Sequence, residues 1–85
     1  MSEENKLVPL VHLEQDEIIM GFVSLCIENC AEKEGVSPRS MYQRMEKVGL
    51  IKNYLINCYD TLHVESTQSV TNLVLETLKR KEAAV

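Results

Sequence analysis

The chain has 85 residues, 45% of them hydrophobic and 26% charged, with three cysteines and a net charge of −4. That is the size of one domain, and the hydrophobic content excludes wholesale disorder. No run reaches the ~18–20 apolar residues of a membrane span, the start MSEENK is too acidic for a signal peptide, and three cysteines imply no disulfide framework. We therefore expect a cytoplasmic protein with no membrane association.

The charge is unevenly distributed along the chain. Residues 1–34 carry eight acidic and two basic side chains, whereas residues 35–59 carry four basic side chains and one acidic. Phosphate contacts supply most of the affinity of general nucleic-acid binders, so an acidic chain is not expected to be one. The basic central segment keeps the question open locally.

The N-terminal part is predicted to form a tail and apolar arm over 1–14 and a helix over 15–34. The stretch LVPLVHL at 7–13 is apolar but contains Pro9, which disfavours a helix interior. We expect an extended arm that packs on the domain or on a neighbouring chain. Apolar residues spaced three and four apart indicate the helix: Ile19, Phe22, Val23, Cys26, Ile27 and Cys30. Ile18 and Leu25 widen this stripe.

Two further helices are predicted over 38–48 and 50–62. Ser37 is a natural N-cap, Pro38 suits the first helical position, and Gly49 is placed to end the first of the two. Apolar and aromatic residues again recur at helical spacing in the second: Leu50, Ile51, Tyr54, Leu55, Cys58, Tyr59 and Leu62.

The last predicted helix covers 67–81, with Ser66 or Thr67 as its cap. Four helices with short connections predict an all-α fold, a small four-helix bundle with an extended N-terminal arm and a single helical domain over 15–85. Small bundles often leave an apolar strip that self-association covers, so a homodimer is among the expected states.

The stretch NCYDTLHVEST places Cys58, Asp60 and His63 within six residues, the side chains that a thiol protease or a zinc site would use. Cys26 and Cys30, four apart on one helix face, could add ligands. Against this, all three cysteines fall on apolar stripes, where a reduced thiol packs as a small hydrophobe, and there is no CxxC pair. We expect no metal, no cofactor and no catalytic residue, and hence no enzyme.

His63 follows the third predicted helix. Its imidazole is expected to satisfy terminal backbone carbonyls or to fix the turn into the next helix, with a partner contact as the alternative. The helices on either side of Gly49 also have the order of a helix-turn-helix, and Lys52 and Asn53 on the outer face could read bases. A DNA-binding regulator is therefore the alternative function.

The stretches CIENCAEKEGVSP and GLIKNYLINCYDTLH resemble a family of short bacterial proteins known as a domain of unknown function. The shared pattern covers about residues 18–78 at these positions: Ile27, Glu28, Ser37, Gly49, Leu50, Tyr54, Tyr59, Asp60, Leu62 and His63. The resemblance implies an all-helical domain with no assigned catalytic activity. Similar proteins are sometimes encoded near ADP-ribosyltransferase-like proteins, which implies an antitoxin-like or adaptor role.

These observations predict a small non-enzymatic protein-interaction module, the regulatory partner of another bacterial protein such as a neighbouring gene product. The candidate interaction or signature residues are Glu28, Tyr54, Tyr59, Asp60 and His63.

Overall fold

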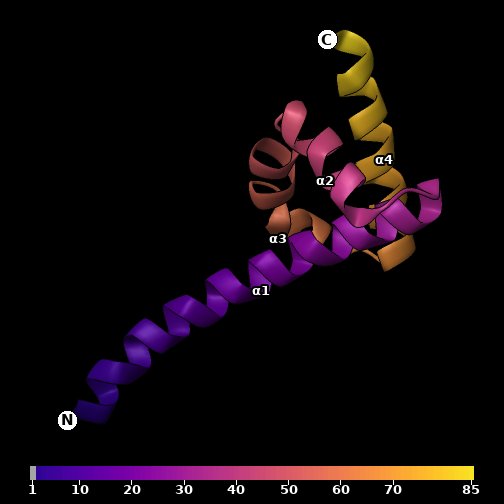
Figure 1. Ribbon diagram of the computed structural model, residues 1–85. Coiled ribbons are helices and arrows are strands. Elements are labelled where there is room, and N and C mark those ends of the chain that lie inside the picture. The colour runs from indigo at the N-terminus through magenta and orange to yellow at the C-terminus, as the bar shows by residue number, and fades with distance from the viewer. Residues whose placement is uncertain (1) are drawn as a thin grey trace.

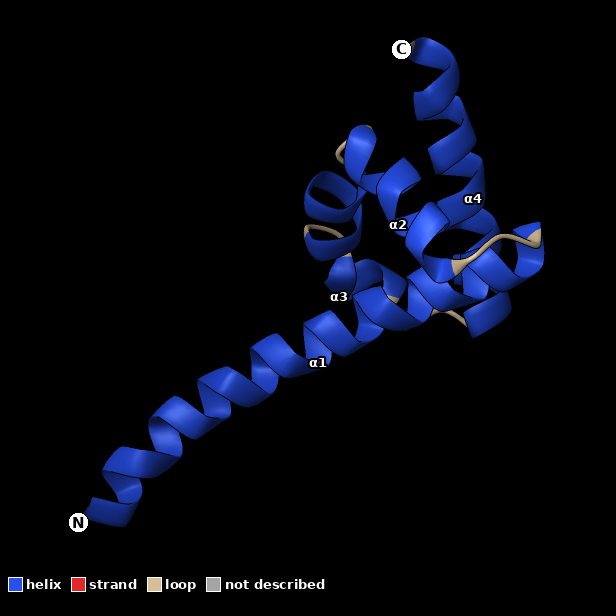
Figure 2. Cartoon of the chain, viewed as in Figure 1, coloured by secondary structure: helices blue, strands red, loops and turns tan. Residues whose placement is uncertain are grey.

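The computed structural model describes the backbone of residues 2–85 and the side chains of residues 15–85, and it is helical throughout (Figures 1 and 2). The elements in chain order are α1 (Ser2–Glu34), α2 (Pro38–Lys47), the π-helix η1 (Ile51–Ile56), α3 (Tyr59–Leu62) and α4 (Thr67–Ala84). No strand occurs in residues 2–85. The predicted all-α class is confirmed, with five helical elements in this part of the chain where four helices were expected.

The C-terminal half of α1 forms the base of the domain, and α2 and α4 both pack on it. The N-terminal half of α1 extends away from the other helices (Figure 1). The core is a single cluster of apolar side chains to which all five helical elements contribute. The fully buried members are Cys30, Met41, Met45, Leu50, Leu55, Val74 and Leu78.

Local capping signals set most of the helix boundaries. The Oγ of Ser37 accepts a hydrogen bond from the backbone N–H of Ser40 at 3.1 Å, and the Oγ of Ser66 accepts from the N–H of Ser69 at the same distance. Gly35 and Gly49 both adopt positive φ, at 72° and 70°, directly after a helix or its last turn. The caps at Ser37, Gly49 and Ser66 were predicted from the sequence, and the structure confirms them.

The predicted extended arm at 7–13 is wrong, because this segment is part of the continuous helix α1. The prediction gave most weight to the cost of an interior proline, about 3 kcal/mol, whereas elongating a helix that has already formed adds a hydrogen bond for each further residue without a new nucleation cost. The arm was also expected to pack on the domain or on a neighbouring chain. The side chains of residues 7–13 lie outside those that the structure describes.

The single helix predicted over 50–62 is also wrong, since the segment consists of a π-helix, a break and a short α-helix. Cys58 lies at the break, with φ −104° and ψ 18°. A π-helix turns less per residue than an α-helix, so the side chains that follow it are rotated relative to a straight helix. This rotation brings Tyr59 against Phe22 of α1, with the ring centroids 5.3 Å apart in an edge-to-face arrangement.

Candidate functional site

Tyr59 and His63 form a stacked pair at the end of α3. Their ring centroids are 4.5 Å apart and their planes differ by 9°. The ring of Phe22 also contacts that of Tyr59, at an interplanar angle of 80°. The three aromatic rings therefore join the α3–α4 corner to α1.

The imidazole of His63 also fixes the end of its own helix. Its Nδ1 lies 2.8 Å from the carbonyl oxygen of Tyr59, which also accepts the backbone N–H of His63 at 2.9 Å. A carbonyl oxygen only accepts, so Nδ1 carries a proton and, in the neutral ring, Nε2 is the acceptor. The predicted role of His63 in satisfying a terminal carbonyl is confirmed.

A pocket of about 150 Å³ opens between α1 and the α3–α4 corner. Its lining combines apolar side chains (Phe22, Leu25, Cys26 and Val70) with polar ones (Asn29, His63, Glu65, Thr67 and Thr71). We call this the corner pocket. Drug-sized ligands occupy pockets of about 300–1,000 Å³, whereas an apolar cavity of about 150 Å³ holds a single benzene ring. The corner pocket therefore has room for one side chain.

The thiols near the corner pocket are poor nucleophiles. Burial raises the pKa of Cys26 to about 11, and burial together with the neighbouring Cys26 and Glu34 raises the pKa of Cys30 to about 12. The Sγ of Cys30 lies 3.9 Å from the carbonyl oxygen of Thr71, a weak donor contact inside the core. Both thiols stay protonated at neutral pH, and a thiol is far less nucleophilic than a thiolate.

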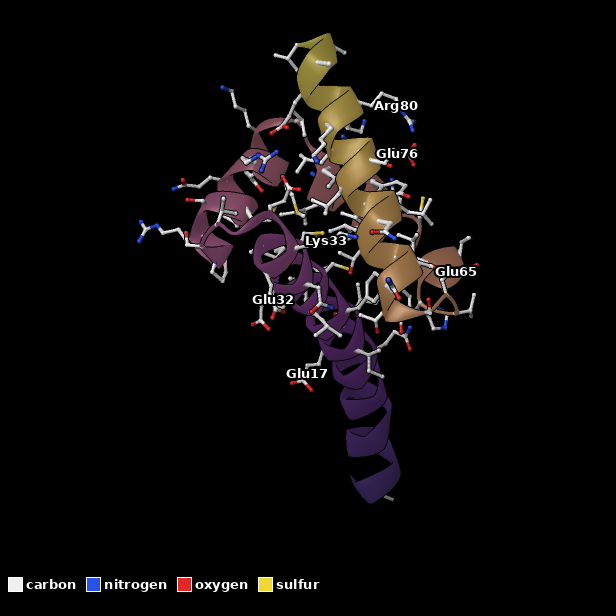
Figure 3. All side chains as sticks on the ribbon, turned by 90° about the vertical axis from the view of Figure 1, so that its right-hand side faces the viewer. Glu17, Glu32, Lys33, Glu65, Glu76 and Arg80 are labelled. Atoms are coloured by element: carbon white, nitrogen blue, oxygen red, sulfur yellow. The ribbon has the colours of Figure 1, made fainter. Side chains whose placement is uncertain are left out.

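One acidic side chain lines the corner pocket, and two others lie on the adjoining surface of α1. Glu65 lies in its wall, while Glu28 and Glu32 are exposed on α1 next to Leu25 and Asn29. Figure 3 shows Glu32 on α1 and Glu65 at the turn that precedes α4. The basic Lys33, in the last turn of α1, reaches toward α4, where its Nζ donates to the Oδ1 of Asn72.

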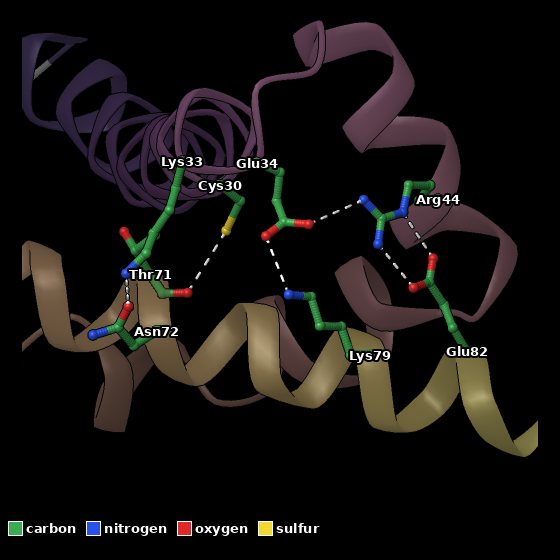
Figure 4. Close-up of polar contacts among 8 residues, drawn as sticks. All are labelled: Cys30, Lys33, Glu34, Arg44, Thr71, Asn72, Lys79 and Glu82. Carbon is green, nitrogen blue, oxygen red and sulfur yellow. Dashed lines mark hydrogen bonds and ion pairs between the residues drawn. The ribbon is translucent and has the colours of Figure 1, made fainter.

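A second polar cluster fastens α4 to α1 and α2 (Figure 4). The guanidinium of Arg44 donates through Nε and Nη2 to the two carboxylate oxygens of Glu82, each at 2.9 Å, and its Nη1 lies 3.8 Å from Glu34. Lys79 donates to Glu34 at 3.2 Å. The hydrogen bonds that Arg44 donates to Glu82 lower the pKa of Glu82 and raise the pKa of Arg44. This ion-pair cluster holds the C-terminal half of α4 in place.

Of the five residues singled out from the sequence, the structure brings together only Tyr59 and His63. Tyr54 is half-buried against the core, and Glu28 and Asp60 are exposed. Sequence reasoning did not select most of the pocket lining. Phe22 and Leu25 were visible as part of the first helical stripe, but Asn29, Thr67, Val70 and Thr71 meet them only through tertiary packing.

The Cys58–Asp60–His63 pattern does not form a linked group. Within residues 15–85, no hydrogen bond connects these side chains, and no cluster of three or more His, Cys, Asp or Glu side chains has the arrangement of a metal site. In the same described part of the chain, no helix combines the length and apolarity that a membrane crossing requires.

The fold and the corner pocket thus define a small all-helical domain with a cleft of side-chain size. A family model described as a protein of unknown function (DUF3791) matches residues 21–81, so the chain belongs to this family. The matched region contains the whole pocket lining. Comparisons with curated proteins and with solved structures give no match. The resemblance to an uncharacterised domain family is confirmed.

Proposed function

We propose that this protein is a non-enzymatic protein-interaction module that binds another bacterial protein as its regulatory or neutralising partner. The observation that carries the proposal is the corner pocket. It is too small for most metabolites, but it suits an anchoring side chain of a partner. The protonated state of the buried thiols and the engagement of His63 Nδ1 by a backbone carbonyl also favour binding over catalysis.

The DNA-binding alternative has weaker support. A recognition helix must lie as a regular element in the major groove, whereas the segment after Gly49 is a six-residue π-helix followed by a break. Ile56, which would face the DNA, is exposed and apolar. We therefore favour a protein partner.

The test is co-expression of the tagged chain with the product of the adjacent gene in its native genome. We expect the two proteins to copurify and to elute together in size-exclusion chromatography with light scattering, at a defined stoichiometry. Separate elution of the two proteins, together with salt-sensitive retardation of the upstream DNA by this chain, would contradict the proposal and favour the alternative.

A further inference from the structure

We propose that the corner pocket binds one aliphatic side chain of a cationic amphipathic helix from the partner protein, and that this helix runs along the exposed edge of α1. The inference rests on the proposed function and deepens it by naming the chemistry of the partner. It follows from three features of the described residues: an apolar edge, acidic side chains in and beside the pocket, and the absence of a strand.

The apolar edge extends from the corner pocket along α1. Ile18, Phe22 and Leu25 follow one another at i, i+4 and i+7, which places them on one side of the helix. Ile18 is 53% exposed and Leu25 is 50% exposed, although both are large apolar side chains. At 1.5 Å per residue, Ile18 lies ~10 Å from Leu25 along the axis, which is two turns of a partner helix. A partner helix with apolar residues seven apart would meet both the pocket and Ile18.

The charge of this surface selects a cationic partner. Glu28 and Glu32 are exposed on α1 one turn from Leu25 and Asn29 respectively, and residues 15–32 contain no Lys or Arg. Across the pocket, Glu65 in the wall adds negative charge, against Lys33 on the α1 side. Opposite charges around an apolar anchor raise the association rate and suppress wrong partners.

The secondary structure of the site favours a helix over an extended peptide. An extended peptide gains its backbone hydrogen bonds by joining a sheet edge, and residues 2–85 contain no strand. A helix satisfies its own backbone and presents side chains at i, i+3, i+4 and i+7 to an apolar groove. The Val64 side chain, 71% exposed in the turn before α4, offers a further apolar contact beside the pocket.

The experiment uses the full chain and a defined probe. The probe is a capped helical peptide of alanine and lysine with two leucines seven residues apart, and the control peptide has glutamate at every lysine position. We expect the lysine peptide to bind in isothermal titration, more weakly as salt is added, and to shift backbone amide NMR signals of Phe22–Asn29 and His63–Thr71. We expect no binding of the glutamate peptide.

Two pairs of variants locate the site. Leu25→Ser should weaken binding of the lysine peptide about tenfold, which corresponds to ~1.4 kcal/mol, whereas Leu73→Ser, which alters a leucine 41% exposed on α4 outside the pocket, should leave it within about twofold. Likewise, Glu65→Lys should weaken binding and reduce its salt dependence, and Glu76→Lys, farther along α4 (Figure 3), should change it less. Thermal unfolding will check that each of the four variants folds.

Several outcomes would overturn the inference: no binding of the lysine peptide at millimolar concentration, equal binding of both peptides, equal effects of the paired variants, or a stable homodimer whose contact covers the pocket. The last outcome would show that a second copy occupies the edge. The proposed function is judged separately. If the gene neighbour copurifies and Leu25→Ser does not weaken that complex, the inference fails and the interaction module stands.

Discussion

The carbonyl oxygen of Tyr59 accepts two hydrogen bonds from His63, one from the backbone N–H at 2.9 Å and one from Nδ1 at 2.8 Å, while the two rings stack 4.5 Å apart. A side chain and its own backbone thus secure the same carbonyl. This arrangement closes α3 and positions the wall of the corner pocket. These contacts fix the conformation of the α3–α4 corner, although α3 contains only four residues.

Replacing His63 by Ala should destabilise the domain measurably. The change removes one hydrogen bond, worth about 1 kcal/mol, and a stacking contact worth about 0.5–1.5 kcal/mol when buried. Because His63 is exposed, we expect a total loss of about 1 kcal/mol from the free energy of unfolding, measured by urea denaturation. His63→Phe keeps a ring and should lose less. Val64→Ala, at the exposed neighbouring position, should have almost no effect; an equal loss in both alanine variants would contradict this role.

The Arg44–Glu82 pair should couple α2 to α4 energetically. A double-mutant cycle with Arg44→Gln and Glu82→Gln should give a coupling energy of about 0.5–1 kcal/mol at neutral pH, because the pair is bidentate but partly solvated. Arg80→Gln, which alters an exposed arginine on the same helix, is the control and should change stability little.

The same pair also predicts an acid dependence. Arg44 holds the pKa of Glu82 below its ordinary value of 4.5, so the stabilisation is fully present above that value and is lost as the pH falls through the lowered pKa. The coupling energy from the cycle should therefore vanish in acid. A coupling that persists once Glu82 is protonated would show that packing, and not charge, links the two side chains.

The three cysteines should differ sharply in reactivity. Cys26 and Cys30 are buried and their pKa values are raised to about 11 and about 12, whereas Cys58 is only half-buried. Iodoacetamide should therefore modify Cys58 first in the native protein, and all three thiols at similar rates in urea. Mass spectrometry of tryptic peptides will give the order. Rapid native modification of Cys26 or Cys30 would refute the buried-core assignment and reopen the thiol-enzyme hypothesis.

These raised pKa values also predict that the folded protein becomes less stable at alkaline pH. A buried thiol resists ionisation, so its contribution to stability is complete below the ordinary pKa of 9.0 and is lost as the pH rises through about 11 and 12. We expect the unfolding midpoint to fall over this range. The fall should be smaller in Cys30→Ala than in the unsubstituted protein, as followed by circular dichroism.

The three glycines should respond in opposite directions to the same substitution. Gly21 lies on the exposed face of α1, and nothing lies within 4 Å of the position that an added Cβ would occupy, so Gly21→Ala should stabilise the helix by about 1 kcal/mol. Gly35→Ala and Gly49→Ala place a Cβ at positive φ and should destabilise by about 1–2 kcal/mol. At Gly49 the new Cβ would also approach the Nδ2 of Asn53 to 2.9 Å. Thermal unfolding will rank the three; a destabilising Gly21→Ala would indicate a contact made by that face.

Residues that act on their immediate neighbours were predictable from the sequence. Ser37 and Ser66 cap helices because a hydroxyl reaches an N–H three residues on, and Gly49 follows the last turn of α2 because its backbone accepts positive φ. Apolar spacing likewise indicated the all-α class and the inward side of α1, where Cys26 and Cys30 proved to be buried. In each case the interaction or pattern that determines the structure lies within a short stretch of adjacent residues.

The π-helix, the break that follows it and the corner pocket depend on contacts between segments that are distant in the sequence. A straight helix over 50–62 satisfies every local rule, yet the contact of Tyr59 with Phe22 accompanies a π-helix and a break that local propensity does not signal. The corner pocket depends on α4 lying against α1, which joins residues about forty positions apart such as Cys30 and Thr71. Local sequence therefore dictates where most helices begin and end, whereas the site exists because non-local packing brings their surfaces together.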